Sequence, residues 1–107
     1  MFKIKFFTIL GIIVFSCSIF VDTANSSMAQ NAARAVIKAK KCYDATPSSY
    51  KKSMLTSMSR AVTHWNDGNK FSKMNQAQMA NFNFQTANTY ASQVLSIGRA
   101  YRIPACN

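Results

Sequence analysis

The sequence predicts an all-α protein, a small three-helix bundle in an up-down-up arrangement that is closed by one disulfide and preceded by a signal peptide. Three observations predict it. Apolar residues recur at three-and-four spacing, turn signals divide the chain into three segments, and an even pair of cysteines remains once the N-terminal segment is removed. The expected helices span about residues 31–44, 47–66 and 72–100.

The N-terminal segment, residues 1–29, has the pattern of a signal peptide. Lys3 and Lys5 form a cationic start, residues 6–21 form an apolar run, and Ser27-Met28-Ala29 is a small-x-small cleavage signal. An equivalent signal would place the cleavage after Ser26. The run is shorter than the ~20 apolar residues that a membrane span needs, and no basic cluster follows it. We therefore expect cleavage after Ala29 and export to the periplasm or the medium.

Two other fates of the N-terminal segment stay open. Val14-Phe15-Ser16-Cys17 loosely resembles a bacterial lipobox, which would make Cys17 a lipid-bearing N-terminus, although Phe15 is bulky for that pattern. An uncleaved apolar run would instead tether the protein to the membrane. Both alternatives change the localisation.

The remaining chain, residues 30–107, is long enough for a single basic helical domain. A domain of this size has a modest core, and a covalent staple is a common compensation. Cys42 and Cys106 form the even pair that remains without Cys17, and an oxidising compartment favours their disulfide. For a loop this long, the chain-entropy estimate of stabilisation is ~4 kcal/mol. Neither cysteine belongs to a C-x-x-C pair, so we expect no metal site.

Charge limits the classes of partner. The chain has 13 basic and 3 acidic side chains, and loss of Lys3, Lys5 and Asp22 with the signal peptide leaves 11 and 2. Such a domain is attracted to acidic proteins, anionic lipids or anionic cell-wall polymers, while an excess of one sign can also serve solubility alone. Outside the cytoplasm we do not expect nucleic acid as the partner.

The first helix carries the clearest cationic pattern. Arg34, Lys38 and Lys41 follow at i, i+4 and i+7 and therefore share one face. With Lys51 and Lys52 at the start of the second helix, they form the predicted partner-binding face. The alternative is a solvated face without a target.

The second helix is predicted to begin after Thr46, with Thr46 as N-cap and Pro47 at the first helical position. Its core positions are expected at three-and-four spacing: Tyr50, Met54, Leu55, Met58, Ala61, Val62 and Trp65. Gly68, just beyond the last of these positions, is expected to terminate the helix.

The third helix is predicted from a four-and-three stripe: Ala80, Phe84, Ala87, Ala91, Val94, Gly98 and Tyr101. The strict alternation of polar and apolar residues over 81–85 also suits a short strand, so the helix could begin late or break there. The small residues indicate a close neighbour, although Gly98 could also cap the helix. Pro104 prevents further continuation.

Catalytic chemistry is not expected. After cleavage, Asp44 and Asp67 are the only carboxylate side chains, and they are predicted at opposite ends of the bundle. His64 is the only histidine, and Asp67 with one of the nearby serines would complete only a nominal triad. No G-x-S-x-G turn or calcium-loop pattern is present. We predict no catalytic residue, no cofactor and no metal.

Two classes of function remain. The first is a non-enzymatic exported interaction protein of the cell envelope or medium, of the inhibitor, exclusion, immunity or assembly-accessory type, which binds an acidic protein through the cationic face. The second is a membrane-active or polymer-binding cationic peptide toxin. It would use an exposed apolar patch that consists of Phe71, Met74, Met79 and Phe82. The oligomeric state does not follow from the sequence.

Overall fold

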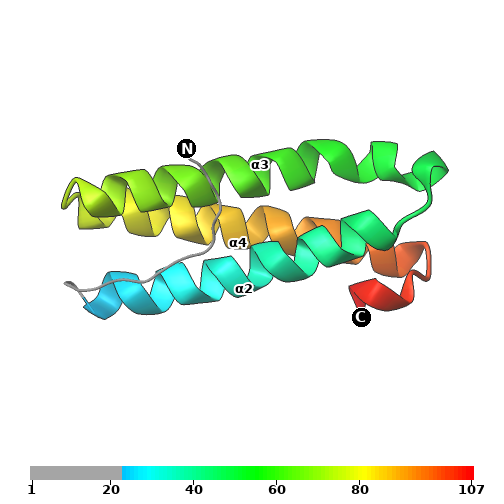
Figure 1. Ribbon diagram of the computed structural model, residues 1–107, viewed down its shortest axis with the longest axis horizontal. Helices are drawn as coiled ribbons and strands as arrows, with labels where there is room; N and C mark the ends of the chain where they lie inside the picture. Colours follow the sequence, from blue (N-terminus) through cyan, green and yellow to red (C-terminus); the bar gives the residue numbers. More distant parts are fainter. Residues whose placement is uncertain (1–22) are drawn as a thin grey trace.

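The computed structural model describes residues 23–107 as three helices followed by a short 3-10 turn. Helix α2 spans Thr23–Ala45, α3 spans Ser48–Lys73, α4 spans Ala77–Ala100, and η2 spans Pro104–Cys106. The helices run up, down and up, so that α2 and α4 both end where the chain terminates (Figure 1). Within residues 23–107 there is no strand. The predicted all-α bundle of three helices is confirmed.

The core consists of two neighbouring clusters of buried side chains. One surrounds Cys42 and Cys106 and includes Met54, Met58 and Val94. The other lies toward the opposite end, around Ala32, Ala80, Phe84 and Ala87, with Trp65 and Phe71 packed against it. Of the seven stripe positions predicted for α4, six are buried, and Tyr101 is the exception. The small residues of the stripe allow the helices to approach closely.

Helix α3 is longer than the sequence predicted, and Gly68 does not terminate it. Gly68 is buried inside the helix, which continues to Lys73. A Cβ atom at position 68 would lie 2.6 Å from Cδ1 of Phe84 on α4. The glycine therefore provides space for an aromatic ring of the neighbouring helix. Asn75, with a φ of 59°, makes the left-handed turn that ends this part of the chain.

The prediction that Thr46 caps α3 and that Pro47 is its first residue is also wrong. Pro47 precedes the first helical residue, and no side chain caps the helix. Thr46 is buried, and its hydroxyl donates to the carbonyl oxygen of Cys42 at 2.7 Å. This hydroxyl therefore satisfies a carbonyl at the end of α2 and does not serve the start of α3.

Helix α4 begins at Ala77 and continues without a break through the alternating segment. Asn83 and Phe84 are adjacent and both buried, whereas Phe82 is exposed, which is a helical and not a strand-like distribution. The predicted start near residue 72 is wrong because α3 occupies residues 72 and 73. The predicted end near Ala100 is confirmed.

Some predicted core positions of α3 lie at the surface. Met54, Met58 and Ala61 are buried, but Leu55 and Val62 are exposed. Tyr50 and Tyr101 are also exposed, and their rings stack with centroids 4.2 Å apart. Helix α3 therefore buries a narrower stripe than the apolar pattern predicted.

The disulfide between Cys42 and Cys106 is confirmed. Both residues are fully buried, and their Cα atoms lie 4.6 Å apart. After α4, Arg102 adopts a positive φ of 61°, and the Ile103 amide donates to the Gly98 carbonyl at 3.0 Å. This turn directs the C-terminal segment back toward α2, where η2 places Cys106 against Cys42.

The N-terminal predictions fall mostly outside the described residues. The cationic start, the apolar run and Cys17 lie there, whereas both expected cleavage sites lie in α2. Helix α2 begins at Thr23 and not near residue 31, and Met28 and Ala29 pack against the core cluster around Phe84. Cleavage after Ala29 would remove this packing, and cleavage after Ser26 would keep it.

Candidate functional site

Three of the five predicted partner-binding residues form one surface on α2. Arg34, Lys38 and Lys41 are all exposed, and we call them the cationic stripe. Among residues 27–107, the one ion pair joins Lys40 and Asp44, with Nζ and Oδ2 2.6 Å apart. Arg34 Nη1 donates to Asn31 Oδ1 at 3.4 Å, which leaves its charge in place. No carboxylate in this part of the chain neutralises the stripe.

The other two predicted residues, Lys51 and Lys52, lie elsewhere. Residues two apart in an α-helix are separated by roughly 200° around its axis, so Lys41 and Tyr43 lie on opposite sides of α2. Tyr43 is half-buried, and the Lys51 ammonium lies 5.1 Å from the centre of its ring. Lys51 therefore lies on the side of α2 away from the stripe. Lys52 is exposed on α3. The structure does not bring all five cations onto one stripe.

Arg99 lies at the same end of the bundle as the last turns of the stripe. It is exposed, and its Nε donates to the carbonyl oxygen of Cys106 at 3.1 Å. Cys106 is bonded to Cys42, which follows Lys38 by one helical turn. The predicted partner-binding face did not include Arg99. The disulfide pairing was the one signal that could have associated Arg99 with α2.

The predicted apolar patch is only partly exposed. Met74, Met79 and Phe82 lie at the surface, whereas Phe71 is half-buried against the core cluster around Phe84. Met74 is the residue that follows the last turn of α3, and Met79 and Phe82 belong to the first turns of α4. We call these three residues the apolar tip. It lies at the end of the bundle opposite the disulfide (Figure 1).

His64 is engaged in a structural hydrogen bond. Its Nδ1 lies 2.9 Å from Oδ1 of Asn83, and Asn83 Nδ2 donates to the carbonyl oxygen of Met79 at 2.9 Å. Because the amide oxygen of Asn83 can only accept, His64 Nδ1 carries the proton. Asn83 is buried, so this bond satisfies a polar group between α3 and α4. The orienting partner of His64 is therefore Asn83, where the nominal triad would use Asp67.

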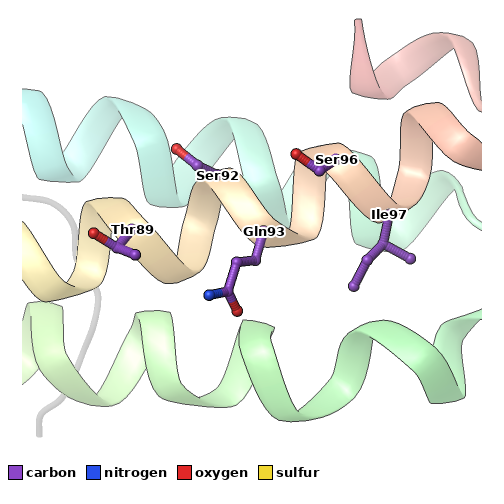
Figure 2. A pocket seen from close by; sticks show the side chains of 5 residues that line it. All are labelled: Thr89, Ser92, Gln93, Ser96 and Ile97. Atoms are coloured by element: carbon purple, nitrogen blue, oxygen red, sulfur yellow. The ribbon is translucent and has the colours of Figure 1, made fainter.

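A shallow depression runs along the surface of α4. It is lined by five uncharged residues: Thr89, Ser92, Gln93, Ser96 and Ile97 (Figure 2). The Gln93 amide oxygen accepts a hydrogen bond of 3.0 Å from the hydroxyl of Ser57 on α3. The depression is open to solvent and brings together no titratable group. It offers hydrogen-bonding surface without a centre for chemistry.

Two further classes of site are not found within the described residues. No group of three or more His, Cys, Asp or Glu side chains is placed to hold a metal ion. None of the helices between Thr23 and Ala100 is both long and apolar enough to cross a membrane. The cationic stripe and the apolar tip remain as the two distinctive surfaces of the domain.

Comparison with known proteins gives no relative from which a function could be proposed, so a proposal has to rest on these surfaces. No family model matches the chain, and no curated protein and no solved structure matches it.

Proposed function

We propose that this protein is a non-enzymatic interaction protein, exported to the cell envelope or the medium, that binds an acidic protein through the cationic stripe. The stripe consists of Arg34, Lys38 and Lys41, and Arg99 lies at the disulfide end of the bundle, toward which the stripe runs. The buried disulfide agrees with folding in an oxidising compartment. Inhibition, exclusion, immunity and assembly are the kinds of role that such binding serves.

The observation that carries the proposal is the alignment of three exposed cations without an opposing carboxylate in residues 27–107. Like charges at this spacing repel one another and cost the isolated helix about 0.2–0.5 kcal/mol per pair. Contact with an acidic surface would relieve this repulsion. Complementary charge of this kind increases the association rate and excludes partners of the same sign.

Binding suits this domain better than catalysis. Its aspartates and its histidine are either engaged with another side chain or far from one another. Asp44 is paired with Lys40, and His64 is bonded to Asn83. Asp67 is half-buried on α3, seven residues before Met74, and thus lies toward the end of the bundle away from Asp44. A pair of cooperating carboxylates would need to be much closer, within about 10 Å.

The experiment is capture of partners from an envelope extract with the tagged, exported protein, at low and at high salt. Lys38→Glu/Lys41→Glu should lose the salt-sensitive partner, because the reversed charges repel an acidic face. Lys70→Glu/Lys73→Glu is the matched control, since it makes the same change in net charge at the opposite end of the bundle. It should retain the partner.

A third variant, Lys51→Glu/Lys52→Glu, tests whether the remaining predicted cations belong to the same interface. Retained binding would restrict the interface to the stripe, and lost binding would extend it to the start of α3. The proposal is wrong if no salt-sensitive partner is captured. It is also wrong if the stripe variant and the Lys70/Lys73 variant lose binding equally, because net charge alone would then explain the capture.

A further inference from the structure

The apolar tip exposes three large apolar side chains next to one turn. The exposed fractions are 50% for Met74, 46% for Met79 and 61% for Phe82. All three lie next to the turn between α3 and α4, at one end of a molecule whose longest dimension is 41 Å. Behind them, Phe71 is half-buried and joins the tip to the core. The three residues of the tip therefore form one apolar surface that is anchored to the core, which distinguishes them from scattered single apolar residues.

Two cations lie beside the tip. Lys70 and Lys73 are exposed in the last turn of α3. The chain contains no Asp or Glu from Gly68 to its last residue, and Asp67, the preceding acidic side chain, is half-buried. An apolar end with a cationic margin is complementary to a bilayer surface, where acyl chains lie below anionic headgroups.

We propose that the apolar tip inserts into the surface of a bilayer that contains anionic phospholipids, with Lys70 and Lys73 at the level of the headgroups. The lysine stems reach along the apolar surface while their ammonium groups stay with the phosphates. This contact is peripheral. It is independent of the proposed protein interface. The cationic stripe lies on a face of α2 and Arg99 lies at the end of α4, and neither belongs to the tip.

A second copy of the chain fits the tip less well. Homodimer interfaces usually have twofold symmetry, and such an interface at the tip would bring Lys70 and Lys73 of one copy close to the same residues of the other. Like charges placed together across an interface are unfavourable. An anionic surface has the opposite effect, because each lysine near it contributes attraction.

The test is co-sedimentation of the exported protein with large vesicles, made either of phosphatidylcholine alone or of phosphatidylcholine with phosphatidylglycerol. We expect binding to the anionic vesicles and weak binding to the neutral ones. Met79→Ser/Phe82→Ser should lower the partition coefficient on anionic vesicles by roughly tenfold or more, because two apolar side chains no longer leave water. Lys70→Glu/Lys73→Glu should abolish the preference for anionic lipid.

The matched control is Ile37→Ser/Leu55→Ser. Ile37 and Leu55 are 56% and 54% exposed, as much as the tip residues. Ile37 lies on α2 and Leu55 lies in the first half of α3, so neither belongs to the tip. This variant should bind the vesicles like the unaltered protein. Equal losses in the control and tip variants would overturn the proposal, since general surface apolarity would then account for the binding. Absence of binding to anionic vesicles, or equal binding to both kinds, would also overturn it.

A second readout locates the contact. The protein has a single tryptophan, Trp65, which is half-buried. Phe82→Trp should add a component whose emission shifts to the blue with anionic vesicles and not with neutral ones. No shift would place the contact elsewhere and overturn the proposal. A dimer that Met79→Ser/Phe82→Ser dissociates in the absence of lipid would assign the tip to a second copy.

Discussion

Gly98 lies against the sulfur of Cys42, so closely that a Cβ atom at position 98 would stand 2.6 Å from that sulfur and 2.8 Å from Cβ of Cys106. The disulfide thus occupies the space that a side chain on α4 would otherwise fill. Because Cys42 also lies in the core cluster with Met54 and Val94, the glycine, the disulfide and the core form one packed unit at this end of the bundle.

Gly98→Ala is therefore expected to lower the free energy of unfolding by about 1–3 kcal/mol, the usual cost of overpacking. This cost exceeds the gain of up to about 1 kcal/mol that alanine brings inside a helix. Denaturant unfolding of the oxidised protein measures it. In a Cys42→Ala/Cys106→Ala background the obstructing sulfurs are gone and only the Cβ atom of residue 106 stays close, so the same substitution should cost much less. An equal cost in both backgrounds would contradict the contact.

Gly68→Ala tests the second glycine. A helix terminator and a close contact with Phe84 are different roles, and the structure assigns the contact. We expect a loss of about 1–3 kcal/mol of unfolding free energy, because the buried ring has little room to move. In a Phe84→Leu background the loss should be smaller, since a smaller and more flexible side chain then replaces the rigid ring. Ser59→Ala, at an exposed position of α3, is the control and should change stability by less than about 0.5 kcal/mol.

The position of the N-terminus is expected to affect stability through Met28. A protein that begins at Ser27 keeps Met28 and Ala29 against the core cluster around Phe84, and a protein that begins at Gln30 loses both. We expect the shorter protein to be less stable by about 1–2 kcal/mol, as for partial burial of one apolar side chain. Met28→Ser in the longer protein should reproduce most of the loss. Equal unfolding midpoints for the two proteins would show that these residues contribute nothing.

The same packing leads to an expectation for processing. A cleavage that preserves the core would follow Ser26, and the pattern of small residues allows both this site and the one after Ala29. Mass spectrometry of the exported protein distinguishes the two. An N-terminus at Ser27 agrees with the packing, whereas an N-terminus at Gln30 would show that processing discards it.

The sequence predicted the features that depend on local periodicity. Spacing identified six buried positions of α4, and the number and placement of cysteines identified the disulfide. Both glycines were less predictable, because glycine serves equally for a left-handed turn and for a close contact. The choice between these roles depends on a partner that is distant in sequence, Phe84 for Gly68 and the disulfide for Gly98.

The candidate site shows the same limit. Spacing within α2 is enough to align Arg34, Lys38 and Lys41, because one helix fixes their relative directions. To place Lys51 and Lys52 on the same face as these three residues, one must know how α3 is rotated about its axis relative to α2. The periodicity within each helix does not carry this information. Packing sets that rotation, and it places Lys51 over Tyr43 on the other side of α2. Similarly, the apolar spacing could not show that Phe71 is drawn toward the core while Phe82 is exposed.

The central claim is that the protein has two independent binding surfaces, the cationic stripe along α2 and the apolar tip at one end of the bundle. The most direct measurement applies both assays, capture of the acidic partner and co-sedimentation with anionic vesicles, to Lys38→Glu/Lys41→Glu and to Met79→Ser/Phe82→Ser. We predict that the first variant loses the partner and keeps most of its vesicle binding, while the second keeps the partner and loses the vesicles. Loss of both activities in both variants would contradict the claim.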